Sequence, residues 1–335
     1  MPNWNIPHGI AGAHHLVEVA QLHGASVATC LEGTSIPAAA IRDAEAAVAP
    51  EQELRLIRNI MAALPQVEGL SLEVGLRYQL TDFGIWGYAL FSSRSLRDAL
   101  LLALRYLDLA AIFGELHFEE SAGEARLRLD YRKAPADVRQ FLIERDTAAI
   151  LKTQRLVDPR PAPPLRMQFE FPQPAYADRF REMFGKLPQF GAKATVFVLD
   201  PRSLDQPLPQ ANAATARMCE AECQRLLARR RARSGISARV RDIILRQPAR
   251  AADMEVVAAE LCMTSRTLRR HLADQGTSFR DLRDEVLMTL AEELIGTARM
   301  KLAEVAERLG YSDAAAFSHA FKRWKGVTPG AARTA

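Results

Sequence analysis

The C-terminal part of the chain contains one helical pattern twice, and this repetition limits the possible folds more than any other feature. In the second copy, the apolar residues of 302–309 recur with helical spacing, Gly310 then turns the chain, and Ser312 is a suitable cap for a following helix. Phe317 and Phe321 lie four residues apart and predict the buried face of that following helix. The pattern predicts two short helices joined by a tight turn, which is a helix-turn-helix unit.

The first copy begins 48 residues earlier, where residues 257–261 predict a helix and residues 262–263 a turn. Thr264 is the predicted cap of the next helix. Leu268 and Leu272 take the places of the two phenylalanines. The chain is therefore predicted to contain two helix-turn-helix units in tandem.

A single helix is predicted between the two units, because the apolar residues of 279–294 follow a helical period. Small and polar residues on the outer side of the last helix suit close approach to base pairs. A chain built in this way can engage two successive major grooves on one face of DNA, whose centres lie ~34 Å apart. The alternative is an ordinary helical bundle whose surface carries these residues by chance.

The distribution of charge agrees with a nucleic-acid partner. Residues 229–335 contain 20 Lys and Arg against 13 Asp and Glu, a net charge of +7, whereas the preceding 228 residues have a net charge of −3. Such an asymmetry is expected when a DNA-binding module is attached to a sensing or assembly module. A basic surface that serves only solubility is the alternative.

The segment from Gly310 to Phe321, together with the Gly-Val-Thr-Pro sequence at 326–329, resembles the C-terminal signature of the AraC/XylS transcription regulators. Residues 234–333 match that domain in length and order. The resemblance implies a sequence-specific transcription regulator, more specifically an effector-responsive activator, that binds double-stranded promoter DNA and works with RNA polymerase. An architectural DNA-binding protein without an effector is one alternative.

Two recognition helices of different chemistry are predicted. The resemblance places Arg266, and Arg269 or Arg270, at positions that reach base edges, where an arginine can bind guanine with two hydrogen bonds. Ala314 and Ala315 offer only apolar contact, so the first unit is predicted to supply most of the hydrogen-bonded readout. The predicted DNA-contacting residues are Thr264, Ser265, Arg266, Thr267, Arg269, Arg270, Ser312, Ala314, Ala315, Ser318, His319, Lys322 and Arg323.

The last three of these residues have different predicted roles. His319 is predicted to lie beside a base edge, and Lys322 and Arg323 are predicted to hold phosphates, contacts that position the protein without specifying a sequence. A solvated surface histidine is the alternative interpretation of His319.

The N-terminal part is predicted to be α+β, so the fold class is multidomain: an α+β sensor domain followed by an all-α domain of two tandem helix-turn-helix units. The predicted limits are 1–210 for the effector-binding and dimerisation domain, 211–233 for a linker helix and 234–333 for the DNA-binding domain, with motifs at about 252–273 and 300–323. Helices are predicted over 15–22, 50–64 and 96–113, the last as the central one, and strands over 116–120, 125–131, 166–171 and 194–199.

A second resemblance covers residues 16–131. Segments 33–34, 72–75, 81–88 and 100–106 resemble the N-terminal region of AraC-type regulators related to ornithine-utilisation activators. This implies an α/β domain that binds a small-molecule effector and forms a homodimer, and not the β-barrel of the arabinose regulator. Phe83, Trp86 and Tyr88 lie beside two glycines and are the candidate ligand-binding residues, because aromatic walls suit a small ligand. A purely structural role in the core is the alternative for these aromatic residues.

No catalytic pattern is present, since the sequence lacks Gly-x-Ser-x-Gly, a Walker-type phosphate loop and His-Glu-x-x-His. No enzyme activity, cofactor or metal is therefore predicted. His14 and His15 are interpreted as surface residues, and Cys219 and Cys223 as buried thiols in preference to metal ligands. An enzyme fused to a DNA-binding module is the alternative from another class.

The protein is predicted to be cytoplasmic. Residues 1–15 have neither a basic start nor an apolar run, and the apolar stretch 96–113 is interrupted by four charged residues, so no membrane partner is expected. The helix predicted over 211–230 carries an apolar stripe that suits either a dimer contact or coupling between domains. The stripe consists of Met218, Cys219, Cys223, Leu226 and Leu227.

Overall fold

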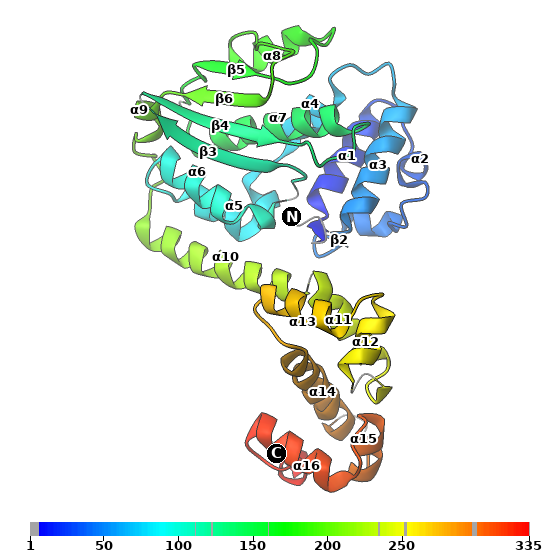
Figure 1. Ribbon diagram of the computed structural model, residues 1–335. Coiled ribbons are helices and arrows are strands. Elements are labelled where there is room, and N and C mark those ends of the chain that lie inside the picture. Colours follow the sequence, from blue (N-terminus) through cyan, green and yellow to red (C-terminus); the bar gives the residue numbers. More distant parts are fainter. Residues whose placement is uncertain are drawn as a thin grey trace. The chain divides into compact units, whose positions relative to one another are not determined.

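The computed structural model describes residues 7–110, 112–121, 123–159, 161–233, 235–250, 253–296 and 300–334 (Figure 1). The chain divides into two compact units, Met1–Ala228 and Arg229–Ala335. The boundary falls inside one helix, α10 (Ala213–Arg233). None of the helices in the described ranges has the length and hydropathy needed to cross a bilayer.

An antiparallel sheet forms the centre of the N-terminal unit. Its four strands have the order β3-β4-β6-β5, and the bounds are β3 Glu115–Ser121, β4 Glu124–Asp130, β5 Arg166–Gln168 and β6 Thr195–Leu199. The side chains of β4 alternate, with Leu127 and Leu129 buried and Arg126 exposed, as expected for a sheet covered on one face. The predicted hairpin and the two later strands are confirmed, although β5 is shorter than the predicted strand.

Helix α7 (Arg139–Val157) contributes Leu142, Ile143 and Leu151 to the core that the sheet also lines. Helix α4 (Leu70–Arg77) packs closely along it, since a Cβ at Gly75 would lie 2.2 Å from the backbone oxygen of Arg145. Helix α7 was not predicted, and the prediction of a central helix over 96–113 was wrong. That segment contains only the shorter α6 (Leu96–Arg105), followed by a 3-10 turn at Leu107–Leu109.

The remaining elements of this unit surround α4, α7 and the sheet (Figure 1). They are β1 His8–Gly9, α1 Ala11–Leu22, α2 Val27–Leu31, β2 Ala47–Val48, α3 Pro50–Ala63, α5 Gly84–Phe91, α8 Ala177–Phe184 and α9 Pro201–Leu204, with 3-10 turns at Ala38–Arg42 and Leu80–Phe83. The interpretation of the histidine pair as surface residues was wrong for His15. This residue is buried in α1, and its Nε2 lies 2.8 Å from Oδ2 of Asp82.

Helix α10 packs its apolar side on the N-terminal unit. Cys219, Cys223 and Leu227 are buried in one cluster with residues of α5 and α6, as the buried-thiol interpretation predicted. Met218 was wrongly placed in this stripe, since it is 66% exposed. The stripe is therefore covered within its own chain.

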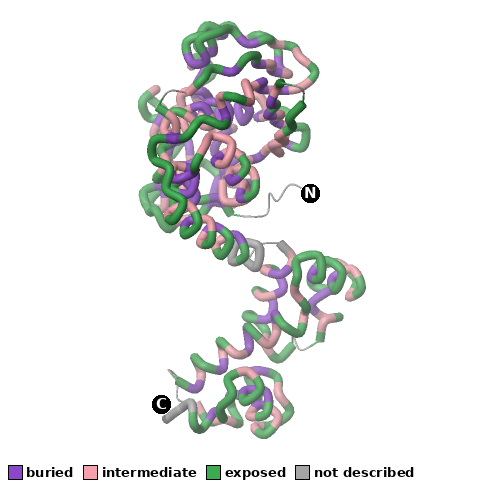
Figure 2. The backbone as a smooth tube through the Cα atoms, turned by 90° about the vertical axis from the view of Figure 1, so that its left-hand side faces the viewer, coloured by how far each residue is buried: buried purple, intermediate pink, exposed green. Residues whose placement is uncertain are grey.

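The C-terminal unit is all helical, with a separate core. Its helices are α11 Gly235–Arg246, α12 Met254–Glu260, α13 Ser265–Asp274, α14 Phe279–Gly296, α15 Leu302–Arg308, α16 Ala314–Lys325 and α17 Pro329–Thr334. The predicted connecting helix is α14, and its residues Leu282 and Leu287 are fully buried in a core shared with both helix pairs. Figure 2 shows the buried residues inside each unit and exposed residues on the outer turns.

Candidate nucleic-acid interface

The first helix-turn-helix consists of α12 and α13. Thr264 caps α13 as predicted, because its Oγ1 accepts a hydrogen bond from the backbone N–H of Thr267 at 3.2 Å. Leu268 and Leu272 are buried on the inner side of α13, which fixes the opposite side toward solvent.

The second helix-turn-helix consists of α15 and α16, with Phe317 and Phe321 buried as predicted. Its cap was assigned one residue too early. Asp313, and not Ser312, caps α16, because its Oδ1 accepts from the backbone N–H of Ala316 at 2.7 Å. That N–H also keeps the pKa of Asp313 below its ordinary value. The hydroxyl of Ser312 donates instead to Asp313, so this residue supports the cap.

The turns of the two units differ in one informative residue. Gly310 turns the second unit with φ of 79°, and Cys262 occupies the corresponding place with φ of 56°. A left-handed backbone is unfavourable for a residue with a Cβ. The first turn is therefore strained where the second is not.

We expect Cys262→Gly to raise the free energy of unfolding of the C-terminal unit by about 0.5–1 kcal/mol, because the left-handed region costs an L residue roughly 1–2 kcal/mol and the chain entropy of glycine offsets only part of the gain. Gly310→Ala is the matched control and should destabilise, since its Cβ would lie 2.6 Å from Cα of Ala249. Urea unfolding of both variants measures these changes. A destabilised Cys262→Gly protein contradicts the assignment of strain.

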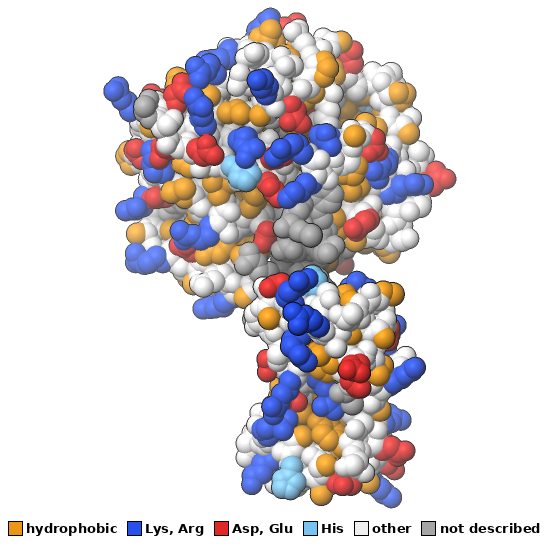
Figure 3. All heavy atoms as spheres, in the orientation of Figure 1, with side chains coloured by type: hydrophobic (Ala, Val, Ile, Leu, Met, Phe, Trp, Pro, Cys, Tyr) orange, Lys and Arg blue, Asp and Glu red, His pale blue; other side chains and the backbone are white. Residues whose placement is uncertain are grey.

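The exposed side of α13 is strongly basic. Arg266, Arg269 and Arg270 are exposed, whereas Ser265 and Thr267 are partly buried near the cap. In the described part of the chain, no hydrogen bond or ion pair engages these three guanidinium groups. Figure 3 shows Lys and Arg side chains in a row along one face of the C-terminal unit. The three arginines of α13 can therefore contact a polyanion without first breaking an ion pair with a described residue.

Helix α16 presents a smaller and less charged surface. Ala315, His319 and Lys322 are exposed, while Ala314 is partly buried and the hydroxyl of Ser318 donates to its backbone oxygen at 2.7 Å. The exposed residue Arg323 lies 3.1 Å from a carboxylate oxygen of Asp284 on α14.

One basic residue outside the predicted set lies beside α13. Arg280, near the start of α14, lines a shallow hollow together with Arg269 and Ser278. Ser278 also accepts from the backbone N–H of Asp281 at 3.2 Å, as a helix cap does. A basic residue two positions after a capping serine is the sequence signal that could have identified Arg280.

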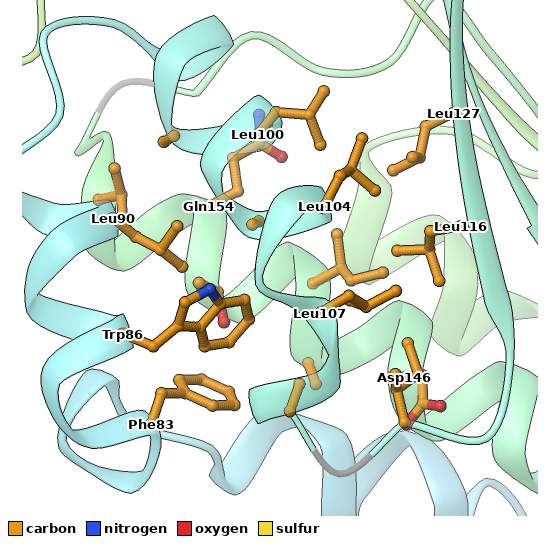
Figure 4. Close-up of a pocket in the computed structure, with 18 of the residues that line it drawn as sticks. Phe83, Trp86, Leu90, Leu100, Leu104, Leu107, Leu116, Leu127, Asp146 and Gln154 are labelled. Atoms are coloured by element: carbon orange, nitrogen blue, oxygen red, sulfur yellow. The ribbon is translucent and has the colours of Figure 1, made fainter. Parts of the chain in front are cut away.

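The N-terminal unit contains an apolar cavity of about 150 Å³. Of the three predicted ligand-binding aromatics, Phe83 and Trp86 line it, and Figure 4 shows both at its edge. Tyr88 does not line it and is 55% exposed. A Cβ at Gly87 would lie 2.0 Å from the backbone oxygen of Leu80, so this glycine permits close packing of α5.

Comparisons with known proteins agree with both halves of this description. Residues 24–208 match a family model described as the arabinose-binding N-terminal domain of the AraC transcription regulator, and residues 257–335 match a helix-turn-helix domain. The chain is 38% identical over 333 residues to an uncharacterised HTH-type transcriptional regulator of Mycobacterium tuberculosis, with 98% of this chain and 96% of the relative covered.

Two further proteins are similar. The ornithine utilization regulator of Pseudomonas aeruginosa is 33% identical over 260 residues, which covers 78% of this chain and 77% of the relative. The transcriptional regulator CdpR from Pseudomonas aeruginosa, whose crystal structure is known, has 26% sequence identity to this chain. The structural match covers 84% of this chain and 98% of CdpR, with a TM-score of 0.41.

Two capped helix-turn-helix units on one core, preceded by an α+β unit with a cavity, define a DNA-binding regulator with a ligand-binding domain. The chain belongs to the AraC family of transcriptional regulators. The predicted fold class and the predicted class of function are confirmed.

Proposed function

We propose that the protein is an effector-responsive activator that places α13 and α16 in successive major grooves of promoter DNA. The observation that carries the proposal is the row of exposed arginines on α13, which have no ion pairs among the described residues and project from a helix fixed by its cap and core. We further propose that it acts as a homodimer in the cytoplasm together with RNA polymerase, and that it catalyses no reaction.

The two recognition helices are proposed to contribute differently. The guanidinium groups of α13 suit hydrogen bonds to guanine, whereas Ala314 and Ala315 of α16 suit apolar contact with a thymine methyl. Lys322 suits a phosphate, because it is exposed and has no ion pair with a described residue. Arg323 must first leave Asp284 to reach a phosphate.

We expect Arg266→Ala or Arg269→Ala to cost about 1–3 kcal/mol of specific DNA binding and to relax base preference in one half of the site, because a two-bond contact to a base is lost. Genome-wide mapping of bound sites supplies the operator. Affinities are then measured on a panel of single-base variants across both half-sites.

Lys322→Ala is the matched control for that panel. It should weaken binding about equally on matched and mismatched sites and reduce the salt slope by roughly one phosphate contact. A larger penalty for base changes beneath α16 than beneath α13 contradicts the proposed division of roles.

We infer that α10 couples the effector site to the DNA-binding unit and is not the dimer contact. Its buried residues Cys219, Cys223 and Leu227 pack with Trp86 and Leu90, which also line the cavity. Helix α10 continues from the first unit into the second. We therefore expect a movement of the cavity wall to be transmitted to the DNA-binding unit through α10. Sedimentation of a Met218→Glu variant tests this assignment, because loss of a homodimer assigns the contact to α10.

Two measurements separate the proposal from its alternatives. In the first, thermal stabilisation by a compound is compared with conversion of that compound: an enzyme converts the compound that stabilises it, whereas a sensor is stabilised without turnover. In the second, affinities for a promoter and for bulk DNA are compared at near-physiological salt: an architectural protein binds both equally well, whereas a specific regulator prefers the promoter.

A further inference from the structure

The cavity of the N-terminal unit is lined almost wholly by hydrocarbon. It lies between α5, α6, α7 and the hairpin β3-β4, and its walls include Leu90, Leu100, Leu104, Leu116 and Ile150. Figure 4 shows these helices and strands around it. An apolar cavity of this volume, about 150 Å³, is large enough to bind a small aromatic molecule.

No counter-ion for a charged ligand lines the cavity, because no Lys, Arg or His is among its described lining residues. Its one carboxylate, Asp146, is already engaged. Asp146 accepts from Nε of Arg145 at 2.7 Å and from the hydroxyl of Tyr131. A ligand charge would therefore be buried without compensation, which is strongly unfavourable.

One of the lining residues, Trp86, has a polar group without a partner among the described residues. Trp86 is only 6% exposed, and its Nε1 is buried with no hydrogen-bond partner among the described residues. A buried N–H of this kind is costly to leave unpaired, so a ligand oxygen that accepts from it gains free energy. The other polar lining side chains, those of Tyr78, Thr153 and Gln154, are neutral and few beside the apolar ones. Most hydroxyls of a sugar and the charged groups of an amino acid would therefore be buried without partners.

We propose that this cavity binds a neutral, hydrocarbon-rich molecule with one carbonyl, ether or hydroxyl oxygen that accepts a hydrogen bond from Nε1 of Trp86. The inference rests on the proposed role of the N-terminal unit as an effector sensor, and it names the chemical class of that effector. It differs from the sugar named in the description of the matching family model.

The test uses the full-length protein and ligands matched in size. Acetophenone has the carbonyl acceptor, ethylbenzene lacks it, and benzoate replaces it with a charge. Affinities are measured by calorimetry, and the indole N–H signals are followed in proton–nitrogen NMR spectra. We expect acetophenone to bind about threefold to tenfold more tightly than ethylbenzene, as one net hydrogen bond predicts, and to shift the Trp86 indole signal. We expect no binding of benzoate, arabinose or ornithine.

Trp86→Phe keeps the aromatic ring and removes the N–H. In this variant the preference for acetophenone over ethylbenzene should disappear. Trp324→Phe is the matched control, because Nε1 of Trp324 is also buried without a partner among the described residues but does not line this cavity. The comparison of the ligands in the unmodified protein remains decisive even where a variant fails to fold.

Equal affinity for acetophenone and ethylbenzene overturns the proposal, as does binding of benzoate, arabinose or ornithine or the absence of binding by both neutral ligands. Promoter binding by the same preparation is measured in parallel. Specific promoter binding without acetophenone binding rejects the ligand class and leaves the regulator role in place. Loss of promoter specificity rejects the proposed function itself.

Discussion

Arg145→Met is expected to lower the free energy of unfolding of the N-terminal unit by about 3–5 kcal/mol, because it leaves two buried carboxylates without their shared cation. Arg145 is fully buried in α7, with its Nη1 2.6 Å from Oε1 of Glu53 and its Nε 2.7 Å from Oδ1 of Asp146. Its guanidinium carbon also lies 5.8 Å from the centre of the Phe113 ring. Methionine is unbranched and fills most of the same space, so the loss of charge dominates the expected effect.

Urea unfolding followed by circular dichroism measures this change, and Arg58→Met is the matched control. Arg58 pairs with Asp137 at 2.6 Å, but their side chains are 39% and 56% exposed. Exposed pairs contribute only about 0–1 kcal/mol, so the control should change little. Equal effects of the two substitutions contradict the assigned importance of the buried network.

The cost of Arg145→Met should also depend on pH. Burial raises the pKa of Glu53, but His8 and Arg145 together hold that pKa below its ordinary value. In the unmodified protein, ionised Glu53 therefore stabilises the fold at pH values above its ordinary pKa, and this contribution is lost as the pH falls through its lowered pKa. Without Arg145 the pKa of Glu53 rises. The difference in unfolding free energy between the two proteins should therefore narrow as the pH falls from the raised pKa of the variant to the lowered pKa of the unmodified protein.

The same network explains why the central helix could not be predicted. The sequence Glu144-Arg145-Asp146 lies in the middle of α7, and three consecutive charges are typical of a surface. These side chains are buried because their partners come from elsewhere, and Glu53 is 92 residues distant in the sequence. A local hydrophobic period contains no information about such pairing. His15 was misplaced for the same reason, since Asp82 is 67 residues away.

The C-terminal unit was predictable because its signals are local. The spacing of Leu268 and Leu272 sets the buried face of α13, and a capping residue directly precedes the helix. The error at α16 was confined to the choice between the adjacent capping residues Ser312 and Asp313. The capping side chain and the backbone N–H that donates to it lie within one helical turn. The sequence alone therefore located the start of α16 to within one residue.

The candidate ligand site was partly visible in the sequence. The aromatic cluster of 81–88 includes Phe83 and Trp86, which line the cavity, whereas the helical turn of α5 directs Tyr88 outward when Trp86 and Ala89 face inward. The opposite walls come from α6, α7 and the sheet. Their meeting depends on the packing of α7, which the sequence did not indicate.

Phe317→Ala is expected to cost about 3–5 kcal/mol of the stability of the C-terminal unit, as the removal of a buried phenylalanine usually does. Phe317 is fully buried, and its ring centre lies 5.8 Å from that of Tyr311 and 5.9 Å from that of Phe321. Because this cluster fixes α16 to the core that α14 shares with α13, DNA binding should fail on matched and mismatched sites alike.

Calorimetry of the full-length protein separates this effect from a general loss of fold. The N-terminal and C-terminal units have separate cores. Phe317→Ala should therefore lower the unfolding temperature of the C-terminal unit and leave that of the N-terminal unit unchanged. Lys322→Ala lies on the same helix but is exposed, so it should weaken DNA binding without a change in either transition. If the Phe317→Ala protein kept both unfolding temperatures, or lost binding to only one half-site of the DNA, the two helix-turn-helix units would be stabilised independently. The shared core would then not couple them.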